Sequence, residues 1–368
     1  STTDQITIIN QFATNSNIHQ IESLEFVDVD GNIITADTID LSKQQDNSYN
    51  YTFTDIGVGG TEGNDTITLT SAFNGLVETF GGNDVINANF AADFNINSGS
   101  GNDNITTGSG NDTIDSGDGD DIINAQSGNN IVNSGSGNDR IDVLSGNDII
   151  QAGDGNDSIN VLGGNNIIDG GAGNDTIRPG SGDDIITGGT GDDNITYYSG
   201  ANHGNDTYIY NKNDGNDTIY ERNANSNSTA DKIQLKDISV DDIIFIRSSN
   251  SLIISFKDNT QINGISTTNS IKITSQLSTD SNYRIESLEF YDANGDLTNT
   301  LNISDPENLP LPLYNLGTDS NNSISGSQYA DTIIGFKGND TLIGNKGDDT
   351  YIYKSGDGVD VIREYSGQ

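Results

Sequence analysis

The stretch GSGNDRIDVLSGNDIIQAGDGNDSINVLGGNNIID, residues 135–169, repeats Gly, Asn and Asp every nine residues. Asp139, Asp148 and Asp157 follow this spacing, whereas Asn166, the next member of the series, lacks the carboxylate. The complete series places Asp or Asn at positions 103, 112, 121, 130, 139, 148, 157, 166, 175, 184 and 193. Gly stands two residues before each position and Ile or Val two residues after it, so this part of the chain is a tandem repeat.

Each nine-residue unit predicts one turn and one short strand. Glycine adopts φ > 0 without a steric penalty, which suits a tight turn, and three residues with a central apolar side chain form a minimal strand. Two units close a coil of eighteen residues, and successive coils stack with parallel strands about 4.8 Å apart. The sequence therefore predicts an all-β parallel solenoid whose core is a column of Ile side chains.

The composition indicates what reinforces such a thin core. Only 31% of the residues are hydrophobic, 44 are Gly, and 55 Asp and Glu against 15 Lys and Arg give a net charge of −40. Turns stacked one coil apart bring carboxylates to about 5 Å from each other. Because carboxylate and carbonyl oxygens suit Ca²⁺, and because the chain has no Cys, we expect Ca²⁺ between the turns.

The motif x-G-x-G-N/D-D-x-I-x resembles the RTX, or haemolysin-type, calcium-binding nonapeptide repeat of large proteins exported by type I secretion. The resemblance implies a right-handed parallel β-roll. Each turn, for example 134–139, would supply its Asp carboxylate and backbone carbonyls to ions shared between turns one coil apart, with roughly 7–12 Ca²⁺ in all. The metal-site residues it implies are Asp65, Asp84, Gly99, Gly101, Asp103, Asp112, Gly117, Gly119, Asp121, Gly135, Gly137, Asp139, Gly153, Gly155, Asp157, Gly171, Gly173, Asp175, Asp184, Gly189, Gly191, Asp193, Asp206, Asp217, Asp331, Asp340, Asp349 and Asp360.

Alternate units fall on opposite edges of the predicted roll, and the two edges differ. Edge A carries Asp65, Asp84, Asp103, Asp121, Asp139, Asp157, Asp175 and Asp193. Edge B carries Asp112, Asn130, Asp148, Asn166 and Asp184, and the first Gly of its G-x-G segment becomes Gln126, Leu144 and Leu162. We therefore predict a full calcium ladder on edge A and a partly replaced one on edge B. Val143-Leu144 and Val161-Leu162 are interpreted as an apolar plug in place of an ion, the alternative being neutral changes with water in the turns.

The repeat is interrupted, which divides the chain. We predict the end of a preceding β-rich module at 1–58, the main roll at 59–221, a β-rich module at 222–304, a Pro-rich linker at 305–315 and a short second roll at 316–368. Residues 19–32 resemble 283–296, and residues 204–221 resemble 347–364. The chain is thus interpreted as a piece of a longer protein.

The charge also bears on partners. A net charge of −40 repels phosphate backbones and anionic lipids, so we predict no nucleic-acid partner, and no apolar run is long enough for direct membrane insertion. Ile131, Ile149, Ile167 and Ile185 recur every eighteen residues at an outward strand position. They form either a protein-docking strip or a column chosen only for strand propensity.

No catalytic constellation emerges. His19 and His203 lack companion ligands, and both are predicted to be solvated surface residues. The expected function is a non-enzymatic, calcium-binding structural segment of a large secreted or cell-surface protein, such as an adhesin, surface-layer component or toxin. The alternative is the non-catalytic carrier region of a secreted enzyme or toxin. Binding of glycans or ice along the roll is the weaker third candidate.

Overall fold

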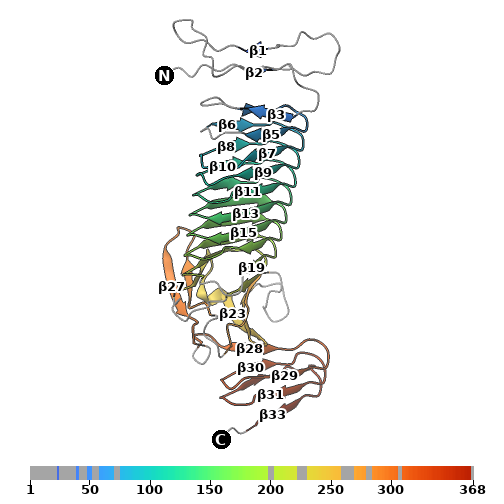
Figure 1. Ribbon diagram of the computed structural model, residues 1–368. Coiled ribbons are helices and arrows are strands. Elements are labelled where there is room, and N and C mark those ends of the chain that lie inside the picture. Colours follow the sequence, from blue (N-terminus) through green and yellow to red (C-terminus); the bar gives the residue numbers. More distant parts are fainter. Residues whose placement is uncertain are drawn as a thin grey trace.

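The computed structural model of the 368-residue chain shows a long stack of short strands (Figure 1). The structure describes residues 23–24, 39–40, 48–51, 58–69, 75–197, 203–221, 230–257, 269–278, 284–305 and 309–365. No α-helix occurs among these residues, and accordingly none of them forms a helix that could span a membrane.

The main roll consists of two parallel sheets that face each other across the core. One sheet holds the strands that follow edge A: β3 (Ser48–Tyr51), β5 (Thr66–Leu69), β7 (Val85–Ala88), β9 (Asn104–Thr107), β11 (Ile122–Asn124), β13 (Arg140–Ser145), β15 (Ser158–Gly163), β17 (Thr176–Arg178), β19 (Asn194–Thr196) and β21 (Asn216–Tyr220). The other holds those that follow edge B: β4 (Val58–Gly59), β6 (Leu76–Glu78), β8 (Asn95–Asn97), β10 (Thr113–Asp115), β12 (Ile131–Asn133), β14 (Ile149–Asp154), β16 (Ile167–Ala172), β18 (Ile185–Thr190) and β20 (Thr207–Asn211).

The strand register reproduces the period of the sequence. Ile123 pairs with Ile141 in β11 and β13, and Val132 pairs with Ile150 in β12 and β14, a step of eighteen residues in both sheets. Upstream, Ile67 pairs with Ile86 across nineteen residues, which absorbs one inserted residue. The predicted parallel β-roll is confirmed.

The predicted Ile column is the core. Ile105, Ile123, Ile141 and Ile159 are fully buried, and the remaining Ile and Val of the series are at most 3% exposed. In contrast, Ile131, Ile149, Ile167 and Ile185 stack in register on the outer face and are 39–47% exposed. The outward position of this strip is confirmed, whereas its use in docking stays a prediction.

The β-rich module continues the roll by hydrogen bonding. It comprises β22 (Lys232–Lys236), the 3₁₀ helix η2 (Val240–Asp242), β23 (Ile243–Ser248), β24 (Ser251–Phe256), β25 (Ser270–Ile273), β26 (Ser287–Tyr291) and β27 (Leu297–Asn302). Strand β22 pairs in parallel with β20, and β25 pairs in parallel with β21. The β23–β24–β25 and β26–β27 pairs are antiparallel, so the repeat stops while both sheets are extended.

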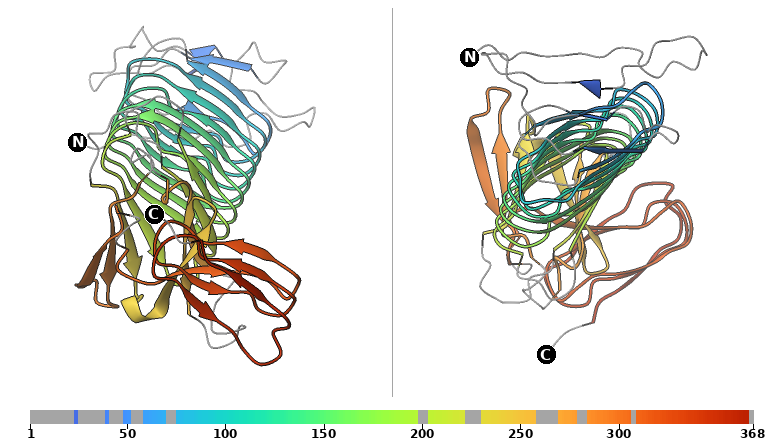
Figure 2. Two further views of the ribbon diagram at one scale, coloured as in Figure 1. Left: turned by 90° about the horizontal axis from the view of Figure 1, so that it is seen from below. Right: turned by 45° about the horizontal axis from the view of Figure 1, so that its top comes forward.

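The second roll contains β28 (Leu313–Leu316), β29 (Ser323–Ser325), β30 (Thr332–Ile334), β31 (Thr341–Ile343), β32 (Thr350–Ile352) and β33 (Val361–Arg363). It lies off the axis of the main roll (Figure 2). Strand β28 starts inside the predicted linker 305–315 and pairs with β23, so one sheet runs from the main roll through the module into the second roll.

At the other end, β3 pairs in parallel with β5, so the stacking begins before residue 59, the predicted start of the roll. Strands β1 (Ser23–Leu24) and β2 (Ile39–Asp40) form a separate antiparallel pair. Apart from Ser23–Leu24, the segment that resembles 283–296 lies outside the described residues, as does His19. The division into domains stays a prediction.

Candidate metal centre

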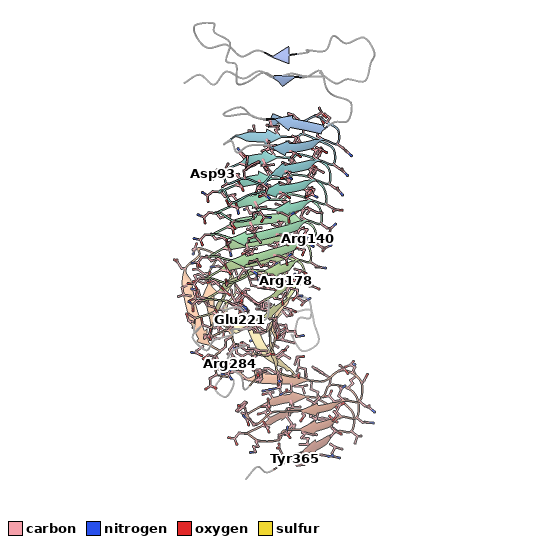
Figure 3. The ribbon with its side chains drawn as sticks, in the orientation of Figure 1. Asp93, Arg140, Arg178, Glu221, Arg284 and Tyr365 are labelled. Carbon is pink, nitrogen blue, oxygen red and sulfur yellow. The ribbon has the colours of Figure 1, made fainter. Side chains whose placement is uncertain are left out.

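A ladder of hydrogen bonds joins the Asp residues of edge A. The backbone N–H of Asp121 donates to Oδ1 of Asp139 over 2.8 Å, and the N–H of Asp139 donates to Oδ1 of Asp157 over 2.7 Å. The same contact links Asp65, Asp84, Asp103, Asp121, Asp139, Asp157, Asp175, Asp193 and Asp217 in order. Side chains project along the edges of the stacked coils (Figure 3). The ladder fixes one oxygen of each carboxylate and orients the other.

The second carboxylate oxygen is buried without a donor at most of these turns. Among the described residues, Oδ2 has no hydrogen-bond partner in Asp84, Asp103, Asp112, Asp121, Asp139, Asp148, Asp157, Asp175, Asp184, Asp193, Asp340 and Asp349. A buried carboxylate oxygen without a partner costs considerable free energy. A hard cation would satisfy it, so the predicted Asp residues fit Ca²⁺.

The glycines allow the turns to stack this closely. Every predicted edge A glycine, from Gly99 to Gly191, has φ between +94° and +142°. A Cβ at Gly137 would lie 2.1 Å from the carbonyl oxygen of Gly119, and one at Gly119 would lie 2.1 Å from that of Gly101. Each backbone therefore rests against the carbonyl of the preceding coil, where no side chain fits.

Burial and mutual repulsion raise the pKa of two central edge A carboxyls. Burial, followed by the charges of neighbouring Asp residues, raises the pKa of Asp121 to about 7 and that of Asp157 to about 7. No group of three or more His, Asp or Glu within the described residues could hold a metal by side chains alone. Ions here would therefore depend on backbone carbonyls as well as carboxylates, as the family resemblance implies.

Edge B has the same hydrogen-bond ladder, but at Asn130 an amide nitrogen replaces the second carboxylate oxygen. The N–H of Asp112 donates to Oδ1 of Asn130 over 3.0 Å, and the N–H of Asn130 donates to Oδ1 of Asp148 over 2.7 Å. The Nδ2 amide of Asn130 donates to the carbonyls of Ala125 and Gly128 over 2.9 and 3.2 Å. These carbonyls face the place where Asp would present its second oxygen.

The predicted apolar plug on edge B is wrong. Val143 and Val161 are buried and belong to the core, but Leu144 and Leu162 are 37% and 54% exposed. Because side chains alternate between the two faces of a strand, a Val in the core directs the next Leu outward. The Leu side chains therefore do not fill the turn.

Asp206 and Asp217 extend the two edges into the module. The N–H of Asp184 donates to Oδ1 of Asp206 over 2.9 Å, and the N–H of Asp206 donates to Oδ1 of Asp231 over 2.7 Å. Asp231 was not predicted from the sequence, although it stands two residues before the buried Ile233, as the Asp or Asn of each repeat stands two residues before its Ile or Val. The insertions around it hide that signal.

Asp206 lies in a buried polar network. Tyr197 donates its hydroxyl to Oδ2 of Asp206 over 2.5 Å and contacts the Tyr208 hydroxyl at 2.7 Å, while Tyr208 donates to Glu221. Burial and the Glu221 charge raise the pKa of Asp206 to about 9. Its second oxygen is already occupied, in contrast to the edge A carboxylates.

The prediction that His203 is a solvated surface residue is wrong. It is fully buried, its ring stacks on Tyr197 at 4.1 Å, and its Nδ1 lies 3.6 Å from Glu221 Oε1. The aromatic stack and the carboxylate together accommodate the imidazole in the interior, which an isolated His in the sequence does not reveal.

The second roll repeats the ladder with different end turns. The N–H of Asp331 donates to Oδ1 of Asp349 over 2.9 Å, and the N–H of Asp340 donates to Oδ1 of Asp360 over 2.9 Å. At Asp331, however, Ser327 donates both its N–H, over 2.5 Å, and its hydroxyl, over 2.8 Å, to Oδ2. Thr61 caps Asp65 in the same way, over 2.6 and 2.9 Å. The carboxylates of these end turns are satisfied by protein donors.

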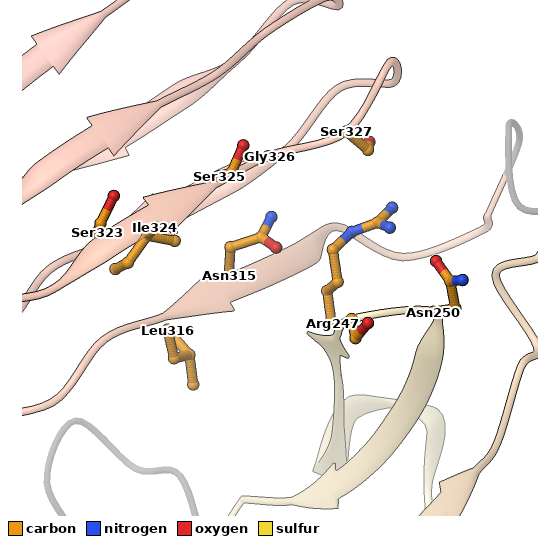
Figure 4. Close-up of a pocket in the computed structure, with 10 residues that line it drawn as sticks. Arg247, Asn250, Asn315, Leu316, Ser323, Ile324, Ser325, Gly326 and Ser327 are labelled. Atoms are coloured by element: carbon orange, nitrogen blue, oxygen red, sulfur yellow. The ribbon is translucent and has the colours of Figure 1, made fainter.

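A cavity of about 490 Å³ separates the module from the second roll (Figure 4). Arg247 and Asn250 line it from the β23–β24 hairpin, and Asn315 and Ser325 line it from the second roll. The Arg247 Nε lies 3.6 Å from Oδ1 of Asp331. This carboxylate therefore has a guanidinium beside it as well as the Ser327 donors.

The comparison with known families agrees with this geometry. The family described as the RTX calcium-binding nonapeptide repeat, in four copies, matches residues 97–132, 133–168, 142–177, 160–195, 169–203 and 316–351. No curated protein sequence matches the chain. Since the repeats of this family bind calcium, residues 97–203 and 316–351 form an RTX-type Ca²⁺-binding repeat region.

Proposed function

We propose that this chain is a structural segment of a large secreted or cell-surface protein, that it folds when it binds Ca²⁺, and that it has no catalytic role of its own. The observation that carries the proposal is the row of edge A carboxylates. From Asp84 to Asp193, each of these carboxylates accepts at Oδ1 a backbone N–H of the preceding coil and leaves Oδ2 buried without a partner. A stack built in this way needs a cation at each gap between coils.

The proposed mechanism couples folding to the calcium level. Without Ca²⁺, neighbouring carboxylates such as Asp139 and Asp157 repel each other within the same buried column. With Ca²⁺, the ions replace this repulsion by attraction and hold the turns in the stacked arrangement. A chain of this kind stays unfolded during type I export from a low-calcium cytosol and folds outside the cell. Seven gaps separate the eight edge A Asp residues from Asp65 to Asp193, and the Asp65 gap is the weakest because Thr61 caps that carboxylate.

Circular dichroism during a Ca²⁺ titration tests this function. In chelator, residues 59–221 should be largely unfolded, and they should fold cooperatively as Ca²⁺ rises toward about 10⁻⁴–10⁻³ M. A parallel titration with Mg²⁺, which demands smaller, near-octahedral sites, separates specific binding from charge screening and should give little folding. Identical spectra with and without Ca²⁺ would contradict the proposal.

The runner-up is a non-catalytic carrier region of a secreted enzyme or toxin. It shares the calcium chemistry and differs only in what the rest of the protein does. The sequence of the flanking reading frame distinguishes the two functions, because a catalytic domain in the same frame would favour the carrier.

A further inference from the structure

Asn130 and Asn166 stand at edge B positions that carry Asp elsewhere, and both side chains are buried. Their orientation follows from the ladder. Oδ1 of Asn130 accepts the N–H of Asp112, and Oδ1 of Asn166 accepts the N–H of Asp148, each over 3.0 Å. Because only the oxygen of an amide accepts, Nδ2 must take the place of the second carboxylate oxygen.

Both Nδ2 groups point at oxygen atoms. The Nδ2 of Asn130 donates to the carbonyls of Ala125 and Gly128, five and two residues earlier in its own turn. The Nδ2 of Asn166 donates to the carbonyl of Gly164 over 3.1 Å and to Oδ1 of Asp184, one coil later, over 2.9 Å. It also reaches the carbonyl of Pro179, five residues before Asp184, over 3.3 Å. One amide thus bridges the carbonyls of a turn and the carboxylate of the next coil.

The same place in the edge A turn of Asp139 holds no amide donor, and the Ser134 hydroxyl there donates to the carbonyl of Ala152 over 2.8 Å. Asp139 has Ser134 and Gly137 at the corresponding five- and two-residue offsets, and its buried Oδ2 makes no hydrogen bond. The Asp139 turn therefore leaves its second carboxylate oxygen without an amide partner, whereas an Asn turn supplies its own amide donor among the surrounding oxygens.

We propose that Asn130 and Asn166 are internal substitutes for the bound cation, so that edge B is joined between Asp112 and Asp184 without calcium at these two turns. The inference rests on the proposed function, since it assumes that the Asp turns hold Ca²⁺. It makes the Asn130 and Asn166 turns calcium-independent, whereas Asp148 between them keeps a buried, unpartnered Oδ2 that fits an ion. The coils between these residues then form the part of the roll that first stacks when calcium is scarce.

Restoring the carboxylate tests the inference. Asn130→Asp should create an ion site, so native mass spectrometry in Ca²⁺ should count at least one ion more than in the unmodified chain. In chelator the variant should be less folded, because the internal donor is replaced by a repelling charge. Asn166→Asp should behave in the same way.

Asn129→Asp is the matched control. It adds the same charge one residue away, but Asn129 is exposed and its Oδ1, which accepts the N–H of Asn147 over 2.8 Å, is retained in Asp. This control should leave the ion number unchanged. If both Asn130→Asp and Asn166→Asp bound no more ions than the loaded unmodified chain, the inference would be overturned. An unmodified chain that binds no Ca²⁺ at all would instead refute the proposed function.

Discussion

The two edges of the main roll share one hydrogen-bond geometry and differ in charge. On edge A, Asp121 donates its N–H to Asp139, and on edge B, Asp112 donates its N–H to Asn130, over 2.8 and 3.0 Å. The two side chains differ only in their second terminal atom. In Asp139 this atom is the carboxylate oxygen Oδ2, which has no partner, and in Asn130 it is the amide nitrogen Nδ2, which donates to carbonyls. The stacking of coils therefore depends on the hydrogen bonds from backbone N–H groups to Oδ1. The need for calcium depends on whether the other terminal atom of the side chain is Oδ2 of Asp or Nδ2 of Asn.

The largest expected effect is common to both edges, because both depend on glycine. Gly137→Ala on edge A and Gly128→Ala on edge B place a Cβ 2.1 and 1.8 Å from a carbonyl of the preceding coil, at φ of +132° and +124°. Each should destabilise the roll by at least about 1–3 kcal/mol. Urea unfolding in saturating Ca²⁺ measures this, and a large loss at one edge only would break the equivalence of the two backbones.

A pH titration in chelator tests whether the charge of the buried carboxylates limits folding without calcium. Burial raises the pKa of Asp121 and Asp157 to about 7, so the folded state binds more protons than the unfolded state. Their stabilising contribution is complete below the ordinary pKa near 4 and is lost as pH rises through about 7. Circular dichroism of the calcium-free chain should therefore show more folded roll at pH 5 than at pH 8. Equal folding at the two pH values would mean that carboxylate repulsion does not limit the calcium-free state.

The smallest effect is expected on the outer face that follows edge B. Ile149 is 40% exposed and stacks between Ile131 and Ile167. Ile149→Thr should change the free energy of unfolding by less than about 0.5 kcal/mol, since Thr also favours strands. Urea unfolding checks this. A loss of several kcal/mol would show that the strip supports the fold and is not a free surface.

The nine-residue period was sufficient to predict the coil, the Ile core and the order of the Asp ladder. Each of these follows from local chemistry repeated in register, as the pairing of Ile123 with Ile141 shows. The period also identified the turns at which Asn130 and Asn166 break the pattern.

Features that depend on three-dimensional neighbours could not be predicted in this way. The exposure of Leu162 follows from strand alternation beside the buried Val161, and the burial of His203 depends on Tyr197 and Glu221. The protein donors at the end turns were overlooked, although Thr61 and Ser327 in place of the first Gly are a readable signal. Asp231 was not predicted because inserted residues interrupt the nine-residue period before it.

Asp139→Asn tests the central claim most directly, because it converts one edge A turn to the edge B type without changing the size of the side chain. The new amide would keep Oδ1 as the acceptor for the N–H of Asp121 and would place Nδ2 where the unpartnered oxygen now lies. The measurement is the folded fraction by circular dichroism in chelator and across a Ca²⁺ titration. If charge sets the need for calcium, the variant is more folded than the unmodified chain in chelator and binds fewer ions at saturation. An unchanged calcium-free state and an unchanged ion number would contradict the claim that the second atom of this side chain decides where calcium is required.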